Sequence, residues 1–586
     1  MSFNLIHDEW IPAKRQDGSE KQIAPWDITR EIAQNPYIAL AAPRPDFNGA
    51  LIQFLIGLVQ TTIAPKDDRA WRTGLTQPPG PVRLKEAFES VAFAFDLDGP
   101  SVRFMQESTL KDGERHPASY LLIDAPTKKP REDNTDHFVK RDLFERAGVP
   151  LGLCLPCVSA ALFTLQLFGP QGGAGKFVGL RGGGPITTLI AGGNLWETIW
   201  LNVLRSGDIQ DLGNVTDASS RFDEKIFPWL GPNALVEEKT GKSTYLADVH
   251  PLHMYWAMPR RILLDFQNST ENCMLCEKTG QSLVFHYQDA TSGIHYKPPW
   301  RHPLSPHHKN KDGVLLPQHG QPDGVSYRHW LGWVLADTSS EEEPARVVHE
   351  FSRRQQWSEL HKALKSGARV WAFGYYLAKM NARGWSEGIM PLIEISESDQ
   401  AAYEENVARL IRVADWTKDN LRIALKRVWQ ARPEVQGQRI VWRFSDIRKL
   451  PKDDAKARER ILSSIGLIRT FQGISARFWQ ETEGDFYATL DGLRKIIQHK
   501  TAITPIRLSW LGVLNKRAER IFDELSQIDM LAASEPRSIV LSLRELRRGN
   551  SAYNPIVRQL LDLPIDFNRH HESVQTSPEE SQLGTT

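Results

Sequence analysis

The chain has 586 residues, of which 41% are hydrophobic and 24% are charged, and its formal net charge is +1. This length exceeds what one hydrophobic core usually organises, so we expect two or more domains. The composition is typical of a soluble globular protein; it excludes a polybasic chain but not a local basic face.

The first hundred residues predict neither a signal peptide nor a membrane span. The N-terminus, MSFNLIHDEWIP, lacks the charged-then-apolar order of a signal peptide, so we expect a cytoplasmic protein. The longest apolar run, residues 49–65, contains two glutamines and two threonines and is too short to cross a membrane. It predicts a buried helix, and a second helix is expected at 84–94.

The four cysteines form two CxxC pairs, Cys154 with Cys157 and Cys273 with Cys276. Four thiolates are what a closed, tetrahedral zinc site requires, and such a site leaves no position for a substrate. We therefore expect one structural zinc ion that joins segments more than a hundred residues apart. Two separate redox motifs are the alternative, although neither pair lies in a clear thioredoxin-like setting.

A glycine-rich stretch, FGPQGGAGKFVGLRGGGP, follows an apolar helix that we expect to end at Gly169-Pro170. A Walker A loop would need glycine at Pro170 and a hydroxyl at Phe177, and a dinucleotide motif would need glycine at Val178. The stretch is therefore not a nucleotide site. Gly172, Gly173 and Gly175 let the backbone approach another surface closely and offer amide donors, or the stretch is a mobile connector between elements.

The next segments predict a strand and a helix. PITTLIAG is β-prone, and GGNLWETIWLNVLRSG predicts a helix with Asn194 as its N-cap and Glu197 completing a capping box. The proline-rich run HYKPPWRHPLSPHHKNKDG predicts no regular element. Its histidines lack the HExxH helix of a metalloprotease, so a structural or surface role is preferred for His302, His307 and His308.

From about residue 400 the hydrophobic pattern becomes helical, with apolar residues at Val407, Leu410, Ala414, Leu421, Ala424 and Val428. Further helices are expected at 454–470, 475–499, 504–531 and 538–563. The pattern predicts an α+β protein: a mixed α/β domain over 1–390, a four-helix bundle over 391–570, and a disordered tail over 571–586.

Positive charge is concentrated in residues 421–470, which hold thirteen Lys or Arg residues and five Asp or Glu residues. Such an excess indicates contact with a polyanion, whereas a solvated helix face is the alternative. The sequence has no GxSxG motif and no cysteine outside the two pairs to act as a nucleophile. These observations favour a binding protein over an enzyme.

Several motifs, in order, resemble the large subunit (CasA) family of the type I-E CRISPR Cascade surveillance complex. They are NLIHDEWIP, DHFVKR, FVGLRGGGPITTLI with LWETIWLNVL, WRHPLSP and GYYLAKMNARGW, and they extend to about residue 390. The resemblance implies a non-catalytic antiviral subunit that checks target double-stranded DNA for a protospacer-adjacent motif (PAM). Its implied partners are the other Cascade subunits, the CRISPR RNA and a helicase-nuclease, with no membrane.

The resemblance also implies which residues meet DNA. Family members read the motif largely from the minor groove, and a hairpin wedge then starts strand separation to form the R-loop. The implied motif-reading residues are Gly172, Gly173, Ala174, Gly175, Phe138, Val139, Lys140 and Lys297. The implied wedge residues are Ala378, Lys379, Met380 and Asn381.

Two other functions remain open from the sequence. A structural scaffold whose basic bundle binds RNA predicts DNA affinity that is independent of any flanking motif. A zinc-dependent nuclease predicts an open metal position, whereas two CxxC pairs predict a closed site.

Overall fold

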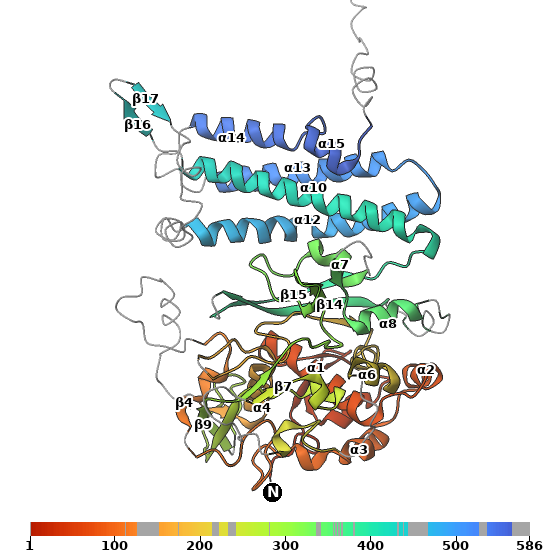
Figure 1. Ribbon diagram of the computed structural model, residues 1–586, viewed down its shortest axis with the longest axis vertical. Coiled ribbons are helices and arrows are strands. Elements are labelled where there is room, and N and C mark those ends of the chain that lie inside the picture. Colours follow the sequence, from red (N-terminus) through yellow and green to blue (C-terminus); the bar gives the residue numbers. More distant parts are fainter. Residues whose placement is uncertain are drawn as a thin grey trace, which may run out of the picture. The chain divides into compact units, whose positions relative to one another are not determined.

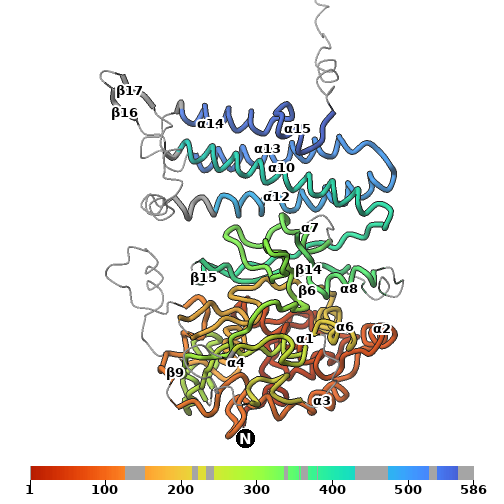
Figure 2. Tube along the Cα trace, viewed as in Figure 1, coloured from red at the N-terminus to blue at the C-terminus, as the bar shows by residue number. Residues whose placement is uncertain are grey.

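The structure is a computed structural model. It describes residues 2–111, 113–125, 152–173, 175–213, 222–231, 242–280, 282–335, 341–355, 357, 360, 364, 367–378, 381–430, 433–436, 439–442, 467–526 and 536–564. The chain divides into two compact units (Figures 1 and 2). The N-terminal unit comprises Met1–Val325 and Gly332–Leu392, and the C-terminal unit comprises Ser326–Leu331 and Ile393–Thr586. No helix in the described ranges is long and apolar enough to cross a membrane.

Helix α1 (Pro45–Ile63) forms the centre of the N-terminal unit and is buried along most of its length. It packs against α4 (Leu155–Phe168) and α5 (Leu195–Trp200). Its Phe54 ring makes edge contacts with five aromatic rings, which explains why an apolar run of this length lies inside the unit. The other α-helices here are α2 (Asp68–Thr76), α3 (Pro81–Glu89), α6 (Ser206–Gly213) and α8 (Arg346–Arg354); α7 (Trp330–Val334) crosses the unit boundary.

Two sheets of the N-terminal unit position the candidate sites. In the first, β9 (Ser282–Ala290) pairs with β4 (Glu114–Pro117), β5 (Leu153–Cys154) and β8 (Arg261–Asn268). In the second, the long antiparallel hairpin of β14 (Arg369–Ala378) and β15 (Asn381–Pro391) is joined by β6 (Thr187–Ala191) (Figure 1).

Smaller sheets complete this unit. Strands β1 (Ile11–Arg15), β2 (Glu20–Ile23) and β3 (Tyr37–Leu40) form one; β7 (Lys242–Thr244) and β10 (Ile294–Tyr296) form another. A third contains β11 (His307–Lys309), β12 (Leu315–Pro317) and β13 (Glu342–Glu343).

The C-terminal unit is a helical bundle, and Figure 1 shows its long helices lying alongside one another. They are α10 (Glu397–Gln430), α12 (Leu467–Gln498), α13 (Thr504–Ser526) and α14 (Pro536–Gly549), with the short α15 (Pro555–Leu561) packed on α10. A two-stranded ribbon of β16 (Pro433–Gln436) and β17 (Arg439–Trp442) follows α10. The six apolar residues predicted to line α10 are all buried.

Tyr327, from the segment Ser326–Leu331, completes the core of the bundle. Its ring is fully buried and stacks on Phe486 at 4.2 Å between centroids. Its hydroxyl forms a 2.9 Å hydrogen bond with Thr482, and its ring edge meets Trp479. The bundle therefore contains a segment that precedes its first long helix by about seventy residues in the sequence.

The predicted α+β class, with a C-terminal helical region, is confirmed, and three local predictions are corrected. The helix expected from Asn194 ends at Trp200, where the backbone amides of Asn202 and Val203 bond three residues back instead of four. The Asn202 side-chain amide bonds both backbone groups of Ile190 in β6 and fixes the chain there. The proline-rich run contains a strand, His307–Lys309, which pairs on both sides.

The helix expected over 538–563 is two helices, because Asn554 caps a new helix at Pro555. Much of the basic segment 421–470, and most of the helix expected at 454–470, lie outside the described residues, as does the tail 571–586. A single division after residue 390 would assign Ser326–Leu331 to the N-terminal unit, whereas the C-terminal compact unit includes these six residues.

Candidate metal centre and nucleic-acid interface

The four cysteines lie together in the N-terminal unit. One sulfur from each of Cys154, Cys157, Cys273 and Cys276 lies within 4.8 Å of all the others. The first three are buried and Cys276 is half-buried. The two CxxC pairs therefore form one cluster, as the sequence predicts for a single tetrahedral site rather than two redox motifs.

Strand pairing brings the two pairs together. Cys154 ends β5, faces Leu283 of β9, and precedes α4, whose first turn contains Cys157. Cys273 and Cys276 occupy the turn between β8 and β9, which closes through the amide of Cys273 and the carbonyl of Lys278. The amide of Cys154 also donates to the Cys273 sulfur at 3.4 Å.

The electrostatics of the cluster favour a thiolate at Cys273. Hydrogen bonds from the Cys154 and then the Cys157 thiol lower the pKa of Cys273 below its ordinary range. The hydrogen bond with Cys154 raises the pKa of Cys157. Four sulfur donors without carboxylate or imidazole are the donor set of a closed structural metal site, so these residues can hold a metal ion with no open position.

The first part of the glycine-rich stretch is an exposed tight loop. Gln171, Gly172 and Gly173 are exposed. The loop closes through two backbone hydrogen bonds between Gly172, Gly173 and Lys176. Gly173 and Gly175 have φ angles of 119° and 75°, which favour glycine. A Cβ at Gly173 would meet nothing within 4 Å, so an exposed backbone surface is available there.

Lys176 anchors this loop and does not extend from it. Its ammonium lies 2.7 Å from the buried carboxylate of Asp289 and 3.7 Å from Glu114. The amide of Ser292 also donates to the carbonyl of Gly175 at 2.7 Å. The loop is thereby fixed to the β9 sheet, which contradicts a mobile connector.

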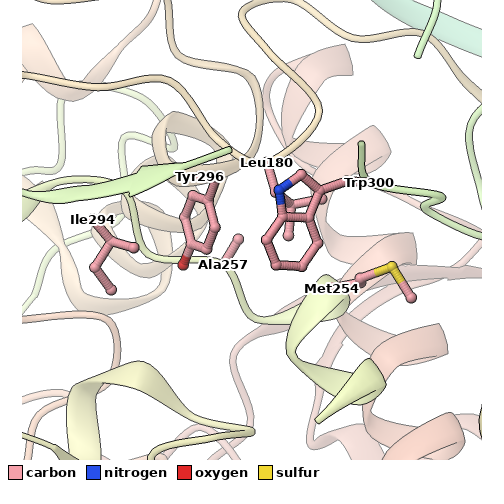
Figure 3. Close-up of a cluster of buried hydrophobic side chains, with 6 residues drawn as sticks. All are labelled: Leu180, Met254, Ala257, Ile294, Tyr296 and Trp300. Atoms are coloured by element: carbon pink, nitrogen blue, oxygen red, sulfur yellow. The ribbon is translucent and has the colours of Figure 1, made fainter. Parts of the chain in front are cut away.

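Lys297 lies two residues after His295, which packs on the glycine-rich stretch. Phe177 stacks on His295 with ring centroids 4.3 Å apart and nearly parallel planes. Partial burial and then the charge of Lys297 lower the pKa of His295. Beneath them, Leu180 packs in a buried cluster with Ile294, Tyr296, Trp300, Met254 and Ala257 (Figure 3). This cluster fixes the segment that contains Lys297 against the glycine-rich stretch.

The second part of the glycine-rich stretch packs against the β14–β15 hairpin. A Cβ at Gly184 would lie 2.5 Å from the Tyr375 carbonyl, and one at Gly183 would lie 3.0 Å from Leu377 and 3.4 Å from Pro170. Gly183 therefore adjoins both the outer part of β14 and the base of the exposed loop. The sequence predicted a close backbone approach for Gly172, Gly173 and Gly175, and it gave no signal that Gly183 and Gly184 contact the hairpin.

Two of the four predicted wedge residues, Ala378 and Asn381, end the described part of the β14–β15 hairpin. Ala378 and Asn381 form the last pair of the β14–β15 ladder. Lys379 and Met380, between them, lie outside the described residues, as do Ala174 and the predicted motif-reading residues Phe138, Val139 and Lys140.

An aromatic cluster connects the hairpin to the glycine-rich stretch. Phe168, the last residue of α4 before the glycines, contacts the rings of Tyr375 and Trp385, with the Trp385 centroid at 5.4 Å. Gly49 of α1 lets Trp385 approach, because a Cβ there would lie 2.7 Å from the indole. No local sequence signal indicated this convergence, which joins residues from three distant segments.

Two of the three histidines of HPLSPHH lie in the interior of the N-terminal unit. His302 and His307 are buried, and burial lowers the pKa of both, to about 4 for His307. The His302 ring accepts a hydrogen bond from the Leu304 amide. Among the described residues, the four cysteines are the cluster suited to a metal ion.

These features define a class of protein: a two-unit α+β chain with a closed four-cysteine centre, an anchored glycine loop and an adjoining hairpin. Residues 4–521 match the family model of CRISPR-associated protein Cse1, and the chain belongs to this family.

Solved structures share the fold across nearly the whole chain. The Cse1 protein from Acidimicrobium ferrooxidans has a TM-score of 0.61 at 15% identity, covering 95% of this chain and 99% of its own. CasA (Cse1) from Thermus thermophilus has a TM-score of 0.61 at 14% identity, covering 96% and 99%. A chain of a CRISPR RNA-guided surveillance complex has a TM-score of 0.59 at 15% identity, covering 94% and 99%. At these identities the likeness is one of fold.

Proposed function

We propose that this chain is the non-catalytic large subunit of a cytoplasmic, RNA-guided type I-E Cascade complex. In this role it recognises the PAM of target double-stranded DNA through the minor groove, starts strand separation and stabilises the R-loop. It also provides a docking surface for the helicase-nuclease. Family membership supports the assignment to a CRISPR system. The positions of the glycine loop and the hairpin support a role in DNA recognition.

One observation carries the proposal for DNA. The base of the exposed glycine loop, at Pro170, and the outer part of the hairpin, at Leu377, both adjoin Gly183. A backbone surface without side chains fits the narrow minor groove, where mainly A·T and G·C pairs can be distinguished. A rigid hairpin beside it can separate the first base pairs, at a cost of a few kcal/mol per unstacked step. Lys297, two residues after the His295 ring that stacks on Phe177, would add a positive charge beside the glycine-rich stretch.

The test compares target binding by the assembled complex with and without this chain. The duplexes have identical protospacers and differ only in the flanking trinucleotide. We expect binding to depend on that trinucleotide only when the chain is present. Equal binding to all flanks would instead support the RNA-binding scaffold.

A matched pair of variants then locates the motif reader. Gly173 and Gly313 both have positive φ angles, and a Cβ at either would meet nothing within 4 Å. Gly173→Leu should abolish the dependence on the flank, because a side chain would keep the loop out of the groove. Gly313→Leu introduces a similar backbone strain elsewhere and should retain that dependence. Similar behaviour of the two variants would contradict reading by the loop.

We also propose that the four cysteines bind a structural zinc ion. The donor set supports zinc, and four protein ligands leave no position for an activated water, which disfavours the zinc-dependent nuclease. Metal analysis of the purified protein should find zinc, and Cys273→Ser should lose it. Metal-dependent DNA cleavage by the purified chain would favour the nuclease instead.

A further inference from the structure

A partly buried ionic cluster, centred on the buried Asp46 carboxylate, lies at the start of α1. Arg44 donates to both oxygens of the Asp46 carboxylate, from Nε at 3.0 Å and from Nη2 at 3.2 Å. The same guanidinium lies 2.8 Å from Asp124, and it donates to the Tyr375 hydroxyl at 3.4 Å. The Tyr375 hydroxyl itself donates to Asp46 at 2.6 Å. One arginine therefore contacts three segments of the N-terminal unit.

The cluster depends on Arg44 for its charge balance. Asp46 is 1% exposed, and a buried carboxylate is costly unless a cation and hydrogen-bond donors accompany it. Burial, and then the Asp46 charge, raise the pKa of Tyr375, so its hydroxyl remains a donor to Asp46. A planar guanidinium can bind two carboxylates and a hydroxyl at once, which an ammonium does less well.

The partners of Arg44 belong to segments that the proposed function requires. Tyr375 lies three residues before Ala378 at the hairpin tip, and its ring packs on Trp385 of the opposite strand. Asp124 is followed in the sequence, after Ala125, by the segment that contains Phe138, Val139 and Lys140. Phe168, which precedes the glycine loop, also contacts the Tyr375 ring.

We propose that Arg44 is a positioning residue for motif-dependent strand separation. It acts through Tyr375, by fixing the β14–β15 hairpin on α1, and through Asp124, by fixing the chain where it leaves for residues 126–151. Arg44 itself does not need to touch DNA. This inference rests on the proposed function, because it concerns the orientation of the hairpin that is proposed to act as a wedge.

The experiment uses the assembled complex with Arg44→Gln and two targets that carry the correct flank. One target is fully paired, and the other is unpaired over the first few base pairs beside the flank. We expect at least a tenfold loss of affinity for the paired target. The unpaired target should bind with near-normal affinity, because its first base pairs are already separated and the hairpin does not have to separate them. Fluorescence of 2-aminopurine in those first base pairs of the paired target should report less opening.

Arg30→Gln is the matched control. Arg30 also binds a buried aspartate, Asp27, which is 2% exposed. It follows directly on η1 (Pro25–Thr29), and its side chain donates a hydrogen bond to Asp27. Arg30→Gln should bind both targets like the unaltered complex.

Two more conservative variants test the same inference if Arg44→Gln folds poorly. Tyr375→Phe keeps the ring and removes only the hydroxyl, and Asp124→Asn keeps the shape and removes the charge. Each should weaken binding of the paired target by a few fold while sparing the unpaired target.

The outcomes separate the inference from the proposed function. If the unaltered complex shows no dependence on the flank, the proposed function fails. If it shows that dependence and all three variants bind the paired target normally, only the role of Arg44 is wrong. Equal losses on the paired and unpaired targets would show that Arg44 maintains the fold without positioning the hairpin, and would also overturn the inference.

Discussion

At the scale of single residues, close backbone contacts determine where glycine is required. Gly182 and Gly184 have φ angles of 81° and 63°. A Cβ at Gly182 would lie 2.4 Å from the His319 ring, and one at Gly184 would lie 2.5 Å from the Tyr375 carbonyl. Each of these glycines therefore combines a left-handed conformation with a contact that excludes any side chain.

Gly184→Ala should lower the free energy of unfolding by about 1–3 kcal/mol, because it adds backbone strain and a clash with the backbone of β14. Urea unfolding measures this change. Gly512→Ala, in α13, is the control: a Cβ there would meet nothing within 4 Å and alanine favours a helix, so the free energy of unfolding should stay the same or rise by up to about 1 kcal/mol. Equal stability of the two variants would contradict the close contact at Gly184.

The burial of His307 should make the free energy of unfolding depend on pH. Burial lowers its pKa from 6.5 to about 4 in the folded protein. Between these values the unfolded chain binds the proton more readily, so stability falls as the pH decreases from about 6.5 towards 4.

Between pH 7 and pH 5, we expect His307 to contribute a loss of about 2 kcal/mol. Urea unfolding at the two pH values measures the loss, and His307→Gln should reduce it. An unchanged pH dependence in the variant would assign the loss to other groups.

At the scale of elements, the cysteine cluster links secondary structure that is distant in sequence. It joins the start of α4 to the turn between β8 and β9, and β5 contributes only two residues to that sheet. Such a short strand gains little from its own hydrogen bonds, so a metal ion would supply much of the stability of this region.

Metal removal tests this link. A strong chelator should lower the thermal unfolding temperature of the unaltered protein by several degrees and increase proteolysis between residues 269 and 281. Cys273→Ser should already show both effects and respond no further to the chelator. A purified protein that contains no metal, with an unchanged unfolding temperature after chelation, would contradict the zinc proposal.

The sequence predicted those parts of the fold that depend on local pattern. The CxxC pairs predicted one cluster, and Asn194 predicted an N-cap, which it forms by accepting a hydrogen bond from the Glu197 amide at 2.9 Å. The contact of Arg44 with Tyr375 joins residues 331 positions apart, and no local pattern encodes it. The predicted end of the helix from Asn194 was wrong. No local pattern shows that the Asn202 side chain bonds the backbone of Ile190 in β6.

At the scale of the whole molecule, the chain passes between its two units after Val325, Leu331 and Leu392. The six residues Ser326–Leu331 therefore belong to the bundle, although the chain returns to the N-terminal unit after them. A domain boundary drawn at one position in the sequence would remove Tyr327 from its core.

Tyr327→Ala should destabilise the C-terminal unit by about 3–5 kcal/mol, as expected when a buried aromatic side chain is truncated. Tyr327→Phe should cost only about 1 kcal/mol, since the Thr482 hydroxyl still donates to the Phe478 carbonyl at 2.7 Å. Hydrogen exchange of peptides from α12 and α13 measures both effects.

Val540→Ala, at a residue that is 66% exposed on α14, is the control and should change exchange little. Faster exchange in α1 alone after Tyr327→Ala would contradict the assignment of this residue to the bundle.

The contacts of Tyr327 in the bundle can form only late in the synthesis of the chain. Its partners Thr482 and Phe486 emerge from the ribosome about 155 residues later, which takes on the order of 10–30 s at typical translation rates. For that interval a large aromatic side chain has no native partner, while most of the N-terminal unit has already been made. The nascent chain should therefore present this segment to chaperones until α12 has been translated.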